Sequence, residues 1–148
     1  TNVDVNAVSP AIQTENESVI MDSLILCKFL RGVFEDRMSS MAHMLQLVTG
    51  WDISSQELEK TAGRIVDVKK WYNIRQGWTP AEDTLPSRFF DDELPDGTSQ
   101  GAVLGREQLA LLITAYNRAR GWNDEGWVPQ ERLQQLGDLQ SETAVLPP

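Results

Sequence analysis

The residues best suited to do chemistry lie in the six-residue stretch Asp22–Cys27, which reads Asp-Ser-Leu-Ile-Leu-Cys. Cys27 is the only cysteine of the chain, and it follows Asp22 within the most apolar run of the sequence. A thiolate is a soft metal ligand, and a carboxylate can accept hydrogen bonds from two adjacent N–H groups. The stretch could therefore serve a metal cluster and a polar cofactor together.

The same residues also fit an ordinary buried helix. Ile20, Leu24 and Cys27 recur at helical spacing, and free cysteine is among the most buried residue types. On a regular helix, positions five apart point about 140° away from each other. Asp22 and Cys27 would share one ligand more easily if the backbone turned between them.

No self-sufficient active site is visible elsewhere, and we assign no catalytic residue. The sequence has no Ser/His/Asp set, no H-E-x-x-H and no phosphate-cradling glycine loop. His43, the only histidine, could be a proton shuttle or a ligand, but it falls off the apolar stripe of its segment and is predicted to be solvated. The acids Asp91, Asp92, Glu93 and Asp96 lack the spacing of a calcium loop and are predicted to form a solvated turn.

Composition narrows the class of protein. The 148 residues carry a formal charge of -9 and no basic run, which argues against nucleic acid or an anionic membrane as partners. No apolar stretch reaches the ~20 residues that span a bilayer, so we expect a soluble, cytoplasmic protein. One cysteine excludes an internal disulfide and a self-contained iron–sulfur site, because such clusters generally take four thiolates. We therefore expect the C-terminal fragment or one domain of a longer enzyme.

Hydrophobic periodicity predicts an all-α, multihelical domain. We expect residues 1–16 to be a linker or surface arm, 17–139 the helical domain, and 140–148 a tail. The expected helices cover part of 18–32, then 35–48, 54–77, a short turn at 79–83, 106–119 and 130–135, with a loop over 86–104.

Local signals support these bounds. Ser54 with Glu57 fits a capping box, while Gly50 and Gly121 are placed to end helices. The apolar stripe of the second helix is Phe34, Met38, Met41, Leu45 and Val48. The predicted core includes Leu45, Ile65, Leu109, Ile113 and Tyr116, with Trp71 or Tyr72 closing one side.

Several segments resemble the tungsten-containing aldehyde ferredoxin oxidoreductase family. Asp22–Cys27 is similar to its D-x-x-G-L-C motif. The segments Trp71–Thr79 and Asp83–Arg88 resemble its N-x-R-x-G and D-D-T-L-P-x-R motifs, and Leu94–Gly97, Tyr116–Trp122 and Leu133–Gly137 follow in the order of the family's C-terminal end. The resemblance covers roughly residues 17 to 139.

The resemblance implies a role for this stretch in a tungsten or molybdenum enzyme with two pterins and one [4Fe-4S] cluster. In that pattern Cys27 is the fourth cluster ligand, Asp22 accepts hydrogen bonds from one pterin, and Leu24 and Leu26 line the dry pocket beside it. The reaction implied is oxidation of an aldehyde to a carboxylate with ferredoxin as electron acceptor. The other cluster ligands would come from upstream domains of the same polypeptide, and a homodimer is possible.

Ile25 departs from the motif, which has glycine at that position. A β-branched residue tolerates positive φ badly. Either the backbone has negative φ there, or this chain approaches its cofactor differently. The rival hypothesis is a cofactor-free helical interaction module whose degenerate motif serves only as core. In both cases we expect no cofactor on the isolated chain.

Overall fold

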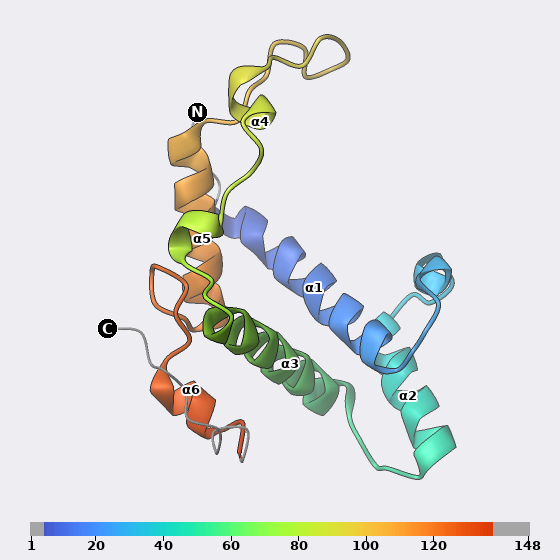
Figure 1. Cartoon of the computed structure of the whole chain (residues 1–148). Helices are drawn as coiled ribbons and strands as arrows, with labels where there is room; N and C mark the ends of the chain where they lie inside the picture. Colours follow the sequence, from blue (N-terminus) through green and yellow to red (C-terminus); the bar gives the residue numbers. More distant parts are fainter. Residues whose placement is uncertain (1–4, 138–148) are drawn as a thin grey trace.

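The computed structural model describes residues 5–137, and within this range it contains helices and no strand, which confirms the all-α prediction. The α-helices are α1 (Val8–Ser23), α2 (Arg37–Thr49), α3 (Ser55–Arg75), α4 (Arg88–Asp91), α5 (Arg106–Arg120) and α6 (Gln130–Gln134) (Figure 1). Three 3₁₀ turns, Val5–Ala7, Lys28–Gly32 and Pro80–Glu82, lie between or before them. In this described part of the chain no helix combines the length and the apolar character needed to cross a membrane.

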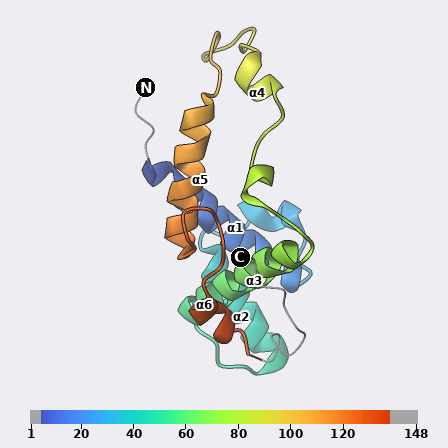
Figure 2. The same cartoon turned by 60° about the vertical axis from the view of Figure 1, so that its left-hand side comes forward.

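Two long helices, α1 and α3, pack along each other and organise the other elements. At one end of the pair α2 contacts both of them, and at the other end α5 packs against α1 (Figure 1). The segment from 84 to 105, which includes α4, projects away from this body beyond the first turn of α5, as both views show (Figure 2).

For the described part of residues 1–16, helix α1 corrects the expectation of a linker, and it also corrects the expected helix start near Ser18. It begins at Val8 and ends at Ser23. Pro10 lies in its first turn, where the missing N–H leaves no helical hydrogen bond unmade. Asn16 and Glu17 are buried in the helix interface although they are polar. Residues 138–148, which include the expected tail, lie outside the described residues.

The predicted caps are confirmed. Ser54 and Glu57 form the capping box that opens α3, with each side chain bonding the other residue's backbone N–H. Gly50 ends α2 at φ 75° and Gly121 ends α5 at φ 76°, both in the left-handed region. A Cβ on Gly121 would also lie 2.9 Å from Nη1 of Arg132, so a larger residue would both strain the backbone and displace that guanidinium.

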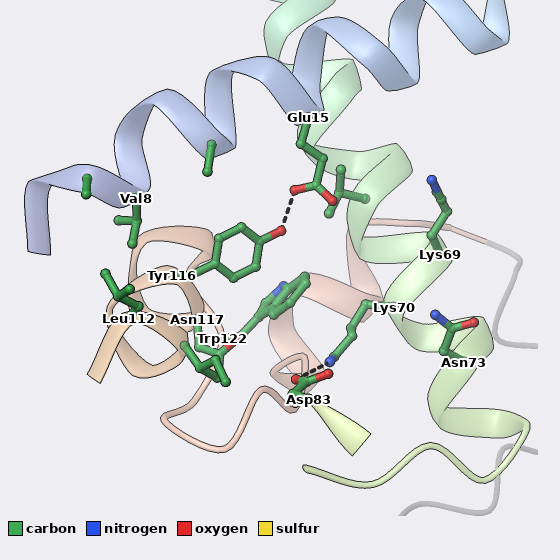
Figure 3. A pocket seen from close by; sticks show the side chains of 14 residues that line it. Val8, Glu15, Lys69, Lys70, Asn73, Asp83, Leu112, Tyr116, Asn117 and Trp122 are labelled. Carbon is green, nitrogen blue, oxygen red and sulfur yellow. Dashed lines mark hydrogen bonds and ion pairs between the residues drawn. The ribbon is translucent and has the colours of Figure 1, made fainter. Parts of the chain in front are cut away.

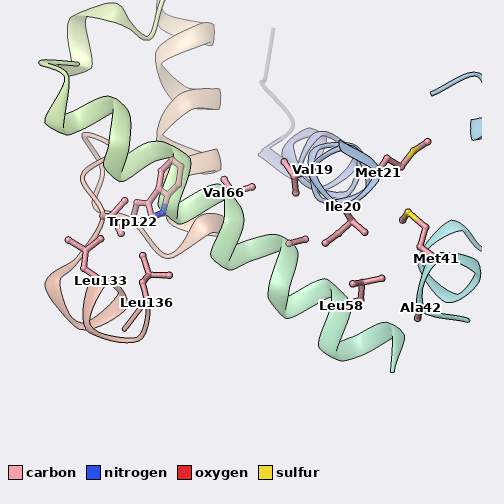
Figure 4. Close-up of a cluster of buried hydrophobic side chains, with 12 residues drawn as sticks. Val19, Ile20, Met21, Met41, Ala42, Leu58, Val66, Trp122, Leu133 and Leu136 are labelled. Carbon is pink, nitrogen blue, oxygen red and sulfur yellow. The ribbon is translucent and has the colours of Figure 1, made fainter. Parts of the chain in front are cut away.

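The hydrophobic core joins α1, α2, α3 and the segment 122–136, which includes α6 (Figure 4). Its buried members are Val19, Ile20, Met21, Met41, Ala42, Leu58, Ala62, Val66, Trp122, Val128, Leu133 and Leu136. Leu45, Ile65, Trp71 and Tyr116 are only half-buried against this cluster. The core therefore centres on Val19, Ile20 and Met21 of α1, and these predicted core residues lie at its margin.

Two details of the predicted stripes are wrong. Val48, assigned to the apolar face of α2, is 85% exposed, and Leu47 beside it is 72% exposed. Leu109 and Ile113 of α5 are half-buried but do not join the core cluster. Ile113 instead faces a cavity that is described below.

Candidate functional site

The stretch Asp22–Cys27 forms the turn that ends α1. The N–H of Leu26 bonds the carbonyl of Met21 at 2.8 Å, and the N–H of Ile25 bonds the carbonyl of Asp22 at 3.2 Å. This pair of bonds is the Schellman arrangement, which satisfies the last carbonyls of a helix. The backbone thus turns between Asp22 and Cys27, as sharing one ligand would require.

Ile25 occupies the left-handed position of this turn, at φ 56°. Of the two alternatives for this position, the structure therefore excludes negative φ. Ile25 is the one described non-glycine residue with positive φ, and its side chain is 91% exposed. A β-branched residue in this conformation is strained, so the backbone keeps the shape of a glycine turn without the glycine.

The predicted site residues face different ways. The side chains of Asp22 and Cys27 are exposed, whereas Leu26 is half-buried and packs inward beside Met21 and Met41. Lys28 Nζ lies 2.9 Å from Oδ1 and 3.1 Å from Oδ2 of Asp22. The carboxylate and the thiol are thus both open to a group outside this chain, and the carboxylate has a cationic neighbour.

This donor set fits a shared site. One exposed thiol can fill one corner of a cluster shell that takes four thiolates. Across residues 5–137, no three His, Cys, Asp or Glu side chains come together to hold a metal ion. Exposed apolar side chains surround the turn, with Phe29 97% exposed, which suits a surface that another body covers.

A cavity of about 510 Å³ lies at the other end of α1, between α1, α3 and α5 (Figure 3). Lys70 reaches it from α3 and pairs with Asp83 at 3.3 Å, while its ammonium lies 3.1 Å from the centroid of the Trp78 ring. Burial lowers the pKa of Lys70, and Asp83 acts in the opposite direction.

Tyr116 enters the cavity from α5 and donates its hydroxyl hydrogen bond to Glu15 of α1. Burial, followed by this hydrogen bond, raises the pKa of Tyr116 to about 12. Arg120 completes the group: it pairs with Glu15, donates Nη1 to Oδ1 of Asn16 at 2.7 Å, and donates Nε to the Tyr116 hydroxyl at 3.1 Å. We call Glu15, Asn16, Tyr116 and Arg120 the Arg120 centre.

A second buried junction connects α3 to the segment 122–136, which includes α6. Asp67 is 3% exposed and accepts hydrogen bonds from Trp122 Nε1 at 2.8 Å and from Arg132 Nε and Nη2 at 3.0 and 2.7 Å. Sequence reasoning missed Asp67, Glu15, Asn16 and Arg120, because no local pattern identifies a charge whose partners lie far along the chain. One signal in the sequence pointed to Arg120, because it lies within Tyr116–Trp122, a segment that resembles the family's C-terminal end.

Comparison with known proteins gives the family. The family model "Aldehyde ferredoxin oxidoreductase, domains 2 & 3" matches residues 3–137. A tungsten-containing aldehyde ferredoxin oxidoreductase of Pyrococcus horikoshii is 32% identical over 132 residues, covering 88% of this chain and 21% of the relative. The enzyme of the same name from Pyrococcus furiosus is 29% identical over 138 residues, covering 92% and 22%.

A more distant relative, named aliphatic sulfonate oxidoreductase, WOR-like subunit, from Pyrococcus furiosus, is 25% identical over 122 residues, covering 78% of this chain and 19% of the relative. The chain spans about a fifth of the length of these curated relatives. The match to the family model covers every described residue. This chain belongs to the aldehyde ferredoxin oxidoreductase family.

Proposed function

We propose that this chain forms the helical part of a tungsten- or molybdenum-pterin enzyme that oxidises aldehydes to carboxylates. The turn Asp22–Cys27 contributes one wall of a composite cofactor site, whose remainder belongs to further parts of the polypeptide. The relatives support this division, because they match the chain over only about a fifth of their own length.

In this proposal Cys27 supplies one thiolate to a [4Fe-4S] cluster, and Asp22 accepts hydrogen bonds from the N–H edge of a pterin. When bound, a tungsten- or molybdenum-pterin centre with its cluster would supply the two-electron oxidation, with ferredoxin as the electron acceptor. The residues of this chain bind and orient: the thiolate matches the softness of iron, and the carboxylate matches adjacent N–H donors. Leu26 packs beneath the turn and holds it against the core.

The observation that carries the proposal is the turn itself. The backbone of Ile25 stays left-handed at φ 56°, the conformation that the family's motif glycine allows, although isoleucine is strained there. The same turn holds the exposed carboxylate of Asp22 and the exposed thiol of Cys27. Strained backbone conformations cluster at ligand-binding sites.

One observation favours the rival function, a helical interaction module without a cofactor. Asp22 already has a cationic partner in Lys28, at 2.9 Å. A pterin edge would have to displace or share that ammonium. Both side chains of the pair are largely exposed, however, and such pairs are worth little in water. The pair can therefore open at small cost when a better donor set arrives.

Metal and pterin analysis of the complete enzyme tests the proposal. Asp22→Asn keeps the shape of the side chain but turns one acceptor into a donor, which in a buried site should cost about 1.5–3 kcal/mol. We expect pterin and tungsten or molybdenum occupancy to fall clearly. Asp36→Asn, an exposed carboxylate at the start of α2, is the matched control and should leave occupancy unchanged. Equal occupancy in Asp22→Asn and the parent would contradict the assignment.

A further inference from the structure

The cavity between α1, α3 and α5 has the size and composition of a small-molecule site. Its volume of about 510 Å³ falls within the range of ~300–1,000 Å³ that is typical of ligand pockets. Its walls are mostly apolar and are formed by Val8, Ala11, Val66, Leu112, Ile113 and Trp122. It lies at the end of α1 away from the turn Asp22–Cys27, so the proposed cofactor wall does not account for it (Figure 1).

Most charged groups that line the cavity are already paired. Glu15 is neutralised by Arg120 and also accepts from Tyr116, while Asp83 is neutralised by Lys70 and also accepts from Trp78 Nε1 at 3.1 Å. These two pairs leave no net charge on the inner walls. A ligand with two charges of one sign, or with a buried cation, would find no partner there.

The rim differs from the inner walls. Lys69 and Asn73 lie one turn apart on α3, line the cavity and are both exposed to solvent (Figure 3). Within residues 5–137 neither side chain has a hydrogen bond or an ion pair. Among the described residues, the rim therefore offers one positive charge without a partner and an amide beside it, above an apolar interior.

We propose that this cavity binds a small monocarboxylate with an apolar tail. The tail would lie against the apolar walls, where removal from water gives most of the affinity. The carboxylate would sit at the rim, where Lys69 and Asn73 donate to it and water still reaches it. This site is separate from the cofactor wall, and the proposal does not depend on the proposed cofactor site.

Calorimetric titration of the intact protein with hexanoate tests the site, with 1-hexanol and hexylamine as matched probes. We expect saturable binding of hexanoate, weaker binding of hexanol and none of hexylamine. Ala11→Phe fills the cavity from an exposed position of α1, so it removes no packed side chain and should abolish binding. Lys69→Gln should weaken hexanoate binding about fivefold and leave hexanol binding unchanged.

Lys60→Gln is the control for Lys69→Gln, because Lys60 is exposed on α3 away from the cavity. It should leave the affinity for hexanoate unchanged. The proposal is overturned if hexanoate does not bind, if hexanol binds equally well, or if Ala11→Phe binds like the parent. An equal loss in Lys60→Gln and Lys69→Gln would also overturn it, since only overall charge would then matter. None of these binding measurements depends on the cofactor content of the protein.

Discussion

Polar side chains are buried and paired at one end of α1 and exposed at the other. At one end the Arg120 centre buries a guanidinium that is 7% exposed and surrounds it with Glu15, Asn16 and Tyr116. At the other end the turn Asp22–Cys27 leaves a carboxylate and a thiol exposed on a strained backbone. Polar groups that fix the fold find their partners within the chain, whereas those suited to chemistry face outward. The difference supports a composite site at the turn.

Removing the buried cation should have the largest effect on stability. Arg120→Met removes a buried cation and its bonds to Glu15 and Asn16 in the interface between α1 and α5. Glu15 is partly exposed and still accepts from Tyr116, so we expect a loss of about 3 kcal/mol, the lower end for breaking a buried pair. Urea unfolding followed by circular dichroism measures this loss. Arg118→Met on the same helix removes an exposed pair with Asp124 and should barely move the midpoint. Similar losses in both variants would mean that burial does not distinguish the two regions.

The second buried junction should behave like the first, with a smaller effect. Asp67→Asn keeps the volume but removes the charge that accepts three hydrogen bonds from Trp122 and Arg132. Arg132 is partly exposed and can recover water, so we expect a loss of about 2 kcal/mol in unfolding free energy. Asp52→Asn, at an exposed position, serves as the control. An unchanged midpoint for Asp67→Asn would contradict a structural role for the junction.

At the turn the expected change has the opposite sign. Ile25→Gly relieves the strain of the left-handed conformation. The isoleucine side chain is 91% exposed, so its removal loses little packing. We expect stabilisation of about 1 kcal/mol after allowing for the extra flexibility of glycine in the unfolded chain. Val33→Gly, also exposed but without positive φ, should destabilise instead. Destabilisation by both substitutions would show that the turn is not strained.

The smallest effect concerns an exposed acid that caps a helix. Hydrogen bonds from the side chain and backbone N–H of Ser39 lower the pKa of Asp36 at the start of α2. A lowered folded-state pKa means that the carboxylate stabilises the fold above its ordinary pKa, and that this contribution is lost as the pH falls through the lowered value. An NMR titration of the Ser39 amide should follow this change. In Asp36→Asn, which caps without titrating, the Ser39 shift should no longer depend on acid pH.

The sequence was sufficient for the fold class and for the caps, because these depend on local chemistry. Ser54 with Glu57, and Gly50 and Gly121, are recognisable from neighbours a few residues away. The first half of α1 was not recognisable, because Pro10 and the polar residues around Asn16 resemble a linker when their distant partners are unknown. Asn16 is buried only because Arg120, 104 positions later, meets it.

The turn could be predicted only in part. The sequence indicated that Asp22 and Cys27 needed a bend between them, and the structure provides one. It could not indicate the conformation of Ile25, since a β-branched residue ordinarily excludes positive φ. The Arg120 centre and the cavity beside it depend on how α1, α3 and α5 meet, and no local pattern contains that information.

The central claim of the proposal is that the exposed thiol of Cys27 is one ligand of an iron–sulfur cluster whose other ligands belong to other parts of the enzyme. Iron analysis and the visible charge-transfer absorbance of the complete enzyme test it directly, with Cys27→Ser compared with the parent and with Ser23→Ala from the same turn. We predict that Cys27→Ser loses iron and absorbance, that Ser23→Ala keeps both, and that the isolated chain gains neither on anaerobic reconstitution. Unchanged iron and absorbance in Cys27→Ser would contradict the claim.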